Sequence, residues 1–347
     1  MLKSVSTVQK EKSISILRIL ATIAVVFSHA CSSITENPEL AALNSSQFTF
    51  LDFSLNFCKW HVPIFFILSG ALLLNKKELT IHNCIFKYAK RIFLALLIFG
   101  IPYALLIQFF DTRMVSVGML WKSVTMTLNN ESFSHLWYLF AMIGIYVSLP
   151  VLKVIVDKAS DNLLRYFLVA LFILNFCVPF VNNMTGMRLA FTIPFGNYAI
   201  FYILLGYYLS CVDMKNIRNI KFWSSIGFIS AAIIAFLFTL FSGTAAKAMA
   251  YQSPINVLAT VSLYCLIRGG EAGECHKLFW KLDRLCFGVY LIHPLFIQFV
   301  YKFLKITPMS FSAWIPMTLV FGIVFVILGF FASWIMSLIK PLKKYVL

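Results

Sequence analysis

Long apolar stretches alternate with short polar and basic segments along almost the whole chain. A helix needs roughly 17–25 mainly apolar residues to cross a bilayer, and about ten stretches come close to that length. The pattern predicts an all-α fold, a polytopic membrane helix bundle of about ten transmembrane helices in a single domain covering residues 1–347. The expected spans are residues 14–33, 48–74, 92–110, 136–156, 166–181, 191–212, 222–241, 255–267, 285–304 and 313–339.

The second stretch contains two polar residues, Lys59 and His61, which leaves its helix open to two interpretations. The helix either runs through both residues or starts later, behind a loop or a re-entrant segment.

The charge distribution predicts which side of the membrane the termini occupy. An even number of spans places both termini on one side of the membrane, and lysines and arginines are concentrated in the segments on that side. By the positive-inside rule, both termini are expected to be cytoplasmic.

The composition agrees with a membrane protein. It is 61% hydrophobic and 12% charged, whereas a soluble domain has about 45–50% apolar and about 25% charged residues. A net charge of +16 can indicate a nucleic-acid partner, but here the basic residues lie between apolar runs, and membrane topology explains them better. We therefore expect no nucleic-acid partner. The six histidines show no metal-ligand spacing, so we also expect no metal site.

Two ionisable residues share one face of the first expected helix. Arg18 and His29 are eleven residues apart, close to three helical turns, so their side chains fall on one stripe, about 16.5 Å apart along the axis. Ionisable residues inside membrane helices are costly and usually functional. The imidazole could take a proton from a hydroxyl or simply bond to a neighbouring helix. The guanidinium could hold a phosphate or snorkel to the cytoplasmic edge, and the residues alone favour neither interpretation.

A short basic amphipathic stretch, residues 81–91, precedes the third span. Its Lys87, Lys90 and Arg91 are typical of an anchor against anionic lipid in the cytoplasmic leaflet, and taken alone they favour that role. The same three residues could instead bind the phosphates of a nucleotide.

The ninth span carries two polar residues beside a proline. Tyr290 and His293 occupy neighbouring positions of one helical face, and Pro294 follows directly. Proline cannot donate a hydrogen bond to the carbonyl of Tyr290, four residues back, so the helix is expected to open or kink there. The kink is either structural or part of a substrate site.

Three further polar residues are candidates for substrate binding. His135 and Trp137 lie at the outer start of the fourth span, where aromatic residues usually act as interfacial anchors. Ser69 precedes Gly70, and such small residues more often allow close helix packing than take part in chemistry.

Six stretches, taken in order, resemble the acyltransferase-3 family of integral-membrane acyltransferases. The resemblance is to the short polysaccharide O-acetyltransferases, which lack an appended hydrolase-like domain, and includes similarity to the type that acts on enterobacterial common antigen. The stretches span most of the chain and read LRILATIAVVFSH, VPIFFILSGALL, KYAKR, HLWYLFAMIGIYVSLPVL, FYILLGYYLS and FGVYLIHPL.

The resemblance implies a multi-pass enzyme of the bacterial cytoplasmic membrane. It would move an acyl group, usually acetyl, from cytoplasmic acyl-CoA to a hydroxyl of a glycan or lipid-linked glycan at the outer face, with acetyl-CoA as donor. The resemblance also implies that His29 is catalytic and that Arg18 is required with it. In one respect the chain departs from the family, which often has paired arginines before the third span, where this chain has Lys87, Lys90 and a single Arg91.

We therefore hypothesise that Arg18, Arg91 and the nearby lysines bind the coenzyme phosphates while the pantetheine arm brings the thioester to His29. His29 would either deprotonate the acceptor hydroxyl or accept the acyl group itself. The first span has no carboxylate, so a partner that orients the imidazole must come from another helix or a loop. Candidates for this partner are Ser69, Tyr290 and His293.

Two other classes of protein fit an apolar bundle with a buried arginine and histidine. A glycolipid transporter or flippase would bind and translocate rather than catalyse. It predicts internal repeats with paired broken helices, and the sequence shows no convincing repeat. A non-catalytic membrane subunit of a polysaccharide-assembly complex is the third class.

Overall fold

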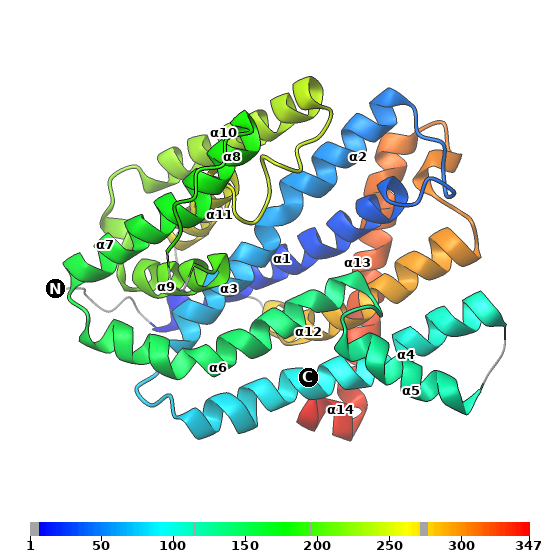
Figure 1. Cartoon of the computed structure of the whole chain (residues 1–347), viewed down its shortest axis with the longest axis horizontal. Helices are drawn as coiled ribbons and strands as arrows, with labels where there is room; N and C mark the ends of the chain where they lie inside the picture. The colour runs from blue at the N-terminus through cyan, green and yellow to red at the C-terminus, as the bar shows by residue number, and fades with distance from the viewer. Residues whose placement is uncertain (1–6, 114–115, 194–195, 271–276) are drawn as a thin grey trace. The chain divides into compact units, whose positions relative to one another are not determined.

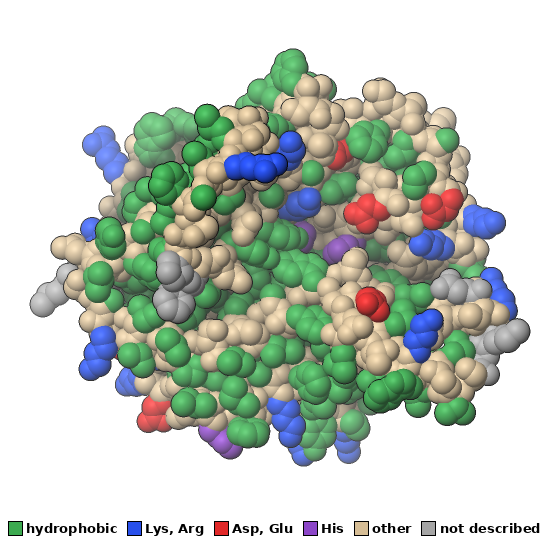
Figure 2. Space-filling model, in the orientation of Figure 1, with side chains coloured by type: hydrophobic (Ala, Val, Ile, Leu, Met, Phe, Trp, Pro, Cys, Tyr) green, Lys and Arg blue, Asp and Glu red, His purple; other side chains and the backbone are tan. Residues whose placement is uncertain are grey.

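The computed structural model describes residues 7–113, 116–193, 196–270 and 277–347 (Figure 1). Helices dominate these residues and none of them forms a strand, which confirms the predicted all-α fold. Residues 1–6, part of the N-terminal segment predicted to be cytoplasmic, lie outside the described residues. Hydrophobic side chains cover much of the surface in Figure 2, as expected of helices that contact lipid.

The helices belong to two compact units. Unit 1 comprises Met1–Asn75 and Ser160–Ile335, and unit 2 comprises Lys76–Ala159 and Met336–Leu347. The helices of unit 1 are α1 (Thr7–Thr35), α2 (Ser45–Phe57), α3 (His61–Leu73), α7 (Asp161–Phe172), α8 (Val178–Thr185), α9 (Tyr198–Cys211), α10 (Ile220–Ser242), α11 (Pro254–Arg268), α12 (Lys277–Gln298) and most of α13 (Trp314–Leu338). Those of unit 2 are α4 (Lys90–Thr112), α5 (Val117–Leu128), α6 (Trp137–Lys158) and α14 (Lys340–Tyr345).

Eight helical segments within the described ranges are long and apolar enough to cross a membrane. They are Lys12–Thr35, Ser45–Leu73, Asn83–Phe110, Ser134–Lys158, Asp161–Thr185, Ile220–Ser242, Lys277–Ser310 and Trp314–Leu338. The sixth and eighth expected spans correspond to shorter apolar helices, Tyr198–Cys211 and Pro254–Arg268. All the expected spans therefore have a helical counterpart, and crossing of the membrane by the two short helices stays a prediction.

The predicted start of the sixth span at residue 191 is wrong. Residues 191–193 and 196–197 are not helical, and α9 begins only at Tyr198. The side chain of Asn197 accepts a hydrogen bond from the backbone N–H of Ala199 and so caps the helix at this point. An apolar run that continues upstream of a cap made the span look longer than the helix is.

The second stretch is helical from Ser45 to Leu73, so its helix runs through both Lys59 and His61, and the alternative of a later start behind a loop or a re-entrant segment is wrong. The helix starts at Ser45, where Asn44 and Gln47 form a capping box. It continues through a single 3₁₀ turn, η1 (Cys58–Trp60), into α3. Lys59 and His61 therefore sit where α2 gives way to α3.

Unit 1 is held together around α1, which packs against α2, α3 and α12 (Figure 1). A further close contact joins α3 to α9 through two glycines. A Cβ atom at Gly70 would lie 1.9 Å from the carbonyl oxygen of Ile203, and one at Gly206 would lie 2.1 Å from that of Ile67. The two backbones are thus in direct contact, as small residues allow in membrane helices.

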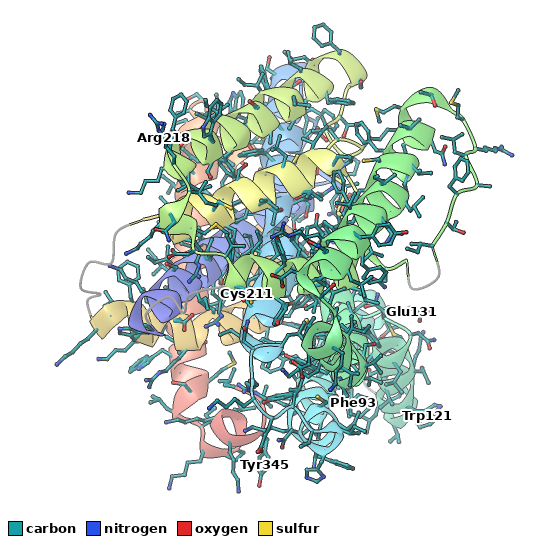
Figure 3. The ribbon with its side chains drawn as sticks, turned by 90° about the vertical axis from the view of Figure 1, so that its left-hand side faces the viewer. Phe93, Trp121, Glu131, Cys211, Arg218 and Tyr345 are labelled. Atoms are coloured by element: carbon teal, nitrogen blue, oxygen red, sulfur yellow. The ribbon has the colours of Figure 1, made fainter. Side chains whose placement is uncertain are left out.

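In unit 2, α4 packs against α5 and α6. The side-chain amide of Gln108 in α4 donates hydrogen bonds to the Ser123 hydroxyl at 2.7 Å and to the Met119 carbonyl at 3.2 Å, both in α5. On the outside of α5, Trp121 is 72% exposed and points away from the unit (Figure 3). A large exposed aromatic ring is typical of a surface that faces lipid or its interface with water.

Candidate active site

Arg18 and His29 lie on one uninterrupted helix. The helix α1 runs from Thr7 to Thr35 without a break, so the eleven residues between the two side chains correspond to about 16.5 Å along its axis. Both residues fall within the candidate span Lys12–Thr35. The predicted stripe of two ionisable side chains on one helix face is therefore present.

Arg18 forms an ion pair with Asp283 of α12. Its Nη1 donates to the Oδ1 of Asp283 at 2.5 Å, and the two side chains are 28% and 14% exposed. The guanidinium is thus held between two helices rather than extended freely toward water. Because a guanidinium has five N–H donors, this one bond leaves donors for a second anion.

His29 lies beside His293, which is also on α12. The centres of the two imidazole rings are 5.2 Å apart, and the rings are tilted by 46°. Arg18 and His29 are eleven residues apart on α1, and their neighbours Asp283 and His293 are ten apart on α12. Two contacts with matching spacing show that α1 and α12 run parallel and in register. The ion pair and the imidazole pair therefore occupy two levels of one helix interface.

Pro294 fixes the orientation of His293. The ring nitrogen Nδ1 of His293 lies 2.9 Å from the carbonyl oxygen of Tyr290 and 3.1 Å from that of Val289. Proline leaves the Tyr290 carbonyl without its usual helical donor, and the imidazole takes that place. Because carbonyl oxygens only accept hydrogen bonds, Nδ1 carries the proton, and Nε2 of the neutral ring is an acceptor. The helix α12 continues through Pro294 without interruption, so the effect of the proline seen here is the imidazole contact that sets the tautomer.

A third histidine joins this pair. His61, at the start of α3, is 3% exposed and interacts electrostatically with His29, His293 and Lys59. Its Nδ1 is buried and has no hydrogen-bond partner among the described residues. We call His29, His61 and His293 the histidine cluster. It is built from three helices of unit 1, so no single stretch of sequence displays it.

The other candidates in unit 1 have local partners. Tyr290 is buried next to His293, with ring centres 6.4 Å apart, and stacks on Phe287. Ser69 donates its hydroxyl hydrogen to the carbonyl of Phe65, one turn back in α3, at 2.8 Å. That bond satisfies the hydroxyl within its own helix, so substrate binding by Ser69 stays a prediction.

The basic stretch before the third span is part of the helix that forms this span. A π-helical segment, η2 (Asn83–Ala89), leads directly into α4. Lys87, Lys90 and Arg91 are exposed and lie three and four residues apart, which puts them on one face of the helix. Arg91 donates from Nε to the carbonyl of Val346 at 2.7 Å, within unit 2.

His135 and Trp137 also belong to unit 2. His135 is buried, with its ring 5.9 Å from Tyr103 and 5.9 Å from Phe133, and Trp137 lies against Tyr138 with ring centres 6.2 Å apart. Among the described residues, no group of three or more His, Cys, Asp and Glu side chains is arranged to hold a metal ion.

A family model described as an acyltransferase domain matches residues 11–338, almost the whole chain. The chain belongs to the acyltransferase-3 family. No curated protein and no solved structure matches the chain. This acyltransferase domain includes both units, and with the candidate membrane spans it makes the protein a multi-pass membrane acyltransferase. A closer likeness to the enzyme of enterobacterial common antigen stays a prediction.

A membrane acyltransferase needs a group that handles the proton or the acyl group and a group that holds an anionic donor, and the histidine cluster and Arg18 can supply them. A neutral imidazole can accept the proton of an attacking hydroxyl or act as a nucleophile. A guanidinium can hold an anion. The distance between Arg18 and His29 along the axis is fixed, because both residues belong to one continuous helix, α1.

Sequence reasoning missed Asp283 and did not assign a role to Lys59 or His61. Asp283 lies two residues before the expected ninth span, which begins at residue 285. The spacing of ten between Asp283 and His293, almost the same as that between Arg18 and His29, was the available signal. It becomes meaningful only once α1 and α12 are known to be parallel neighbours.

Proposed function

We propose that this acyltransferase transfers an acyl group, most simply acetyl, from cytoplasmic acyl-CoA to a hydroxyl of a cell-surface polysaccharide or lipid-linked glycan. The enzyme would work in the bacterial cytoplasmic membrane and use acetyl-CoA as the acyl donor, with no metal. The observation that supports this best is the in-register interface of α1 and α12, with a cation at one level and imidazoles at the other.

In this proposal, Arg18 binds a phosphate of the coenzyme with the donors that Asp283 leaves available. The long pantetheine arm of the coenzyme then places the thioester at the level of His29. Lys87, Lys90 and Arg91 offer a second phosphate-binding surface on unit 2, because their charges lie on one exposed helix face.

His29 serves in one of two ways. As a general base it takes the proton of the acceptor hydroxyl while the oxygen attacks the thioester carbonyl, and it returns the proton to the departing thiolate. As a nucleophile it accepts the acyl group on nitrogen, and the acceptor hydroxyl then attacks this acyl-imidazole. His293 and Tyr290 line the same level, which supports a role for them near the acceptor.

The proposal is tested with acetyl-CoA that carries a labelled acetyl group, added to membranes that contain the wild-type protein. We expect the label to appear in a glycan or glycolipid fraction, and the surface glycan of a deletion strain to lack the mass of one acyl group per modified unit. No labelled glycan, together with an unchanged glycan mass in the deletion strain, would contradict it. Movement of glycolipid without acylation would point to a flippase.

A further inference from the structure

Lys59 is an ammonium group placed inside a candidate membrane span. It belongs to the η1 turn and lies within the span Ser45–Leu73. A lysine at such a position is costly and usually functional unless a carboxylate neutralises it. No salt bridge joins Lys59 to a carboxylate within the described ranges.

A chain of hydrogen bonds holds the Lys59 ammonium. Its Nζ donates to Oδ1 of Asn56 at 2.6 Å, and Nδ2 of Asn56 donates to Oδ1 of Asp52 at 2.9 Å. The bond to Asp52 fixes which end of the Asn56 amide faces Lys59. Asp52 therefore orients Lys59 through an amide; Asp52 and Glu36 interact electrostatically with the ammonium without forming an ion pair with it.

The carboxylate of Asp52 also accepts hydrogen bonds from residues other than Asn56. They come from the hydroxyls of Thr239 and Thr244 at 3.3 Å and 2.8 Å, and from the N–H of Ala245 at 2.8 Å. The described structure gives Lys59 one hydrogen-bond partner, Asn56, so two of its three N–H donors are available to a ligand.

Lys59 belongs to a segment that packs against α1 next to His29. The hydroxyl of Ser28, the residue before His29, donates to the carbonyl of Leu55 at 3.1 Å. Leu55 directly precedes Asn56, which holds the ammonium. The η1 turn also packs against α1, and His61 interacts electrostatically with both Lys59 and His29.

Resting on the proposed function, we propose that Lys59 binds the carbonyl oxygen of the acyl group and stabilises the oxyanion formed during transfer. The attacking oxygen forms a bond to the thioester carbon, and the electron pair of the C=O bond moves onto the oxygen that Lys59 contacts. His29 takes the hydroxyl proton in the general-base route. The oxyanion then re-forms C=O, the C–S bond breaks, and the thiolate leaves with the proton from His29.

This assignment follows from what the transition state requires. Negative charge develops on one oxygen next to the reacting imidazole, and an oriented donor in a site shielded from water stabilises it strongly. Lys59 is pre-oriented by Asn56 and keeps free donors, so it needs little reorganisation as the charge forms. The histidines, in contrast, are used for proton transfer or for binding the acceptor.

The test compares Lys59→Met and Lys59→Arg with a matched control, Lys302→Met, whose lysine is exposed in unit 1. Rates of transfer from acetyl-CoA are divided by the amount of folded, detergent-solubilised protein, and coenzyme affinity is measured separately. We expect Lys59→Met to lower kcat by a factor of about 100 or more, as for loss of an oxyanion donor, with coenzyme affinity unchanged. Lys59→Arg should recover part of the rate, and Lys302→Met should match the wild type.

Three results would overturn the inference while wild-type transfer is intact. The first is a normal kcat per folded Lys59→Met molecule, which would make Lys59 a structural link to Asn56. The second is a rise in KM for the acceptor alone, which would make Lys59 a binding group for the acceptor. The third is loss of coenzyme affinity in Lys59→Met. Absence of transfer by the wild type would instead refute the proposed function itself.

Discussion

Replacement of Gly70 by alanine should separate α3 from α9. The new Cβ atom would lie 1.9 Å from the carbonyl oxygen of Ile203, whereas real Cβ atoms essentially never approach within 3.0 Å, so the gap must widen by at least 3.0 − 1.9 = 1.1 Å. The obstructing atom belongs to the backbone and cannot turn aside. Overpacking of this kind costs about 3 kcal/mol at the upper end of its usual range.

Two effects of Gly70→Ala oppose each other. Alanine favours the helix over glycine by about 1 kcal/mol, which leaves a net loss near 2 kcal/mol. For a chain of this size such a loss lowers the Tm by about 3 °C. Because α3 begins at His61, the displaced helix should also disturb the histidine cluster and slow acyl transfer.

The assay is thermal unfolding of the detergent-solubilised protein, followed by intrinsic fluorescence, with Gly144→Ala as the control. Gly144 lies in α6, and an added Cβ there would meet no atom within 4 Å, so this variant should keep or slightly raise the Tm. A Gly70→Ala protein as stable as Gly144→Ala would refute the close contact of α3 with α9.

Further predictions concern the α1–α12 interface. Asp283→Asn should destabilise the protein by about 1–2 kcal/mol, less than for a fully buried pair because both side chains are partly exposed, and Tm values of a double-mutant cycle with Arg18→Ala should show coupling. Arg18→Ala should lose coenzyme affinity, measured by equilibrium binding, while still inserting normally; unchanged affinity would mean that Arg18 only snorkels. Pro294→Ala supplies an N–H that competes for the Tyr290 carbonyl, so His293 should lose its fixed tautomer and transfer should slow several-fold at nearly constant Tm. An unchanged rate for this variant would show that the orientation of His293 does not matter.

Much of the fold could be predicted from hydropathy, because long apolar runs have few alternatives to helix in a membrane. The errors arose where short-range polar interactions overrule hydropathy. Asn197 caps α9 inside an apolar run, and Asn44 with Gln47 starts α2 upstream of the expected span. The division into two units depends on contacts between distant segments, which hydropathy does not reveal.

The candidate site could be predicted only where it lies on one helix. Arg18 and His29 were recognisable because their spacing on α1 is local. Asp283 and His61 reach the site only through packing of α12 and α3 against α1, so their roles depend on tertiary structure. Lys59 was visible as a polar residue in an apolar stretch, but its support by Asn56 was not.

The most direct test of the account is acyl transfer by His29→Ala. Labelled acetyl-CoA is supplied to membranes with equal amounts of wild-type and variant protein, and His82→Ala serves as the control because His82 is exposed in unit 2. We predict loss of labelled glycan in His29→Ala, with normal insertion and coenzyme affinity, and full transfer in His82→Ala. Full transfer by a correctly inserted His29→Ala would contradict the role of the imidazole at the α1–α12 interface.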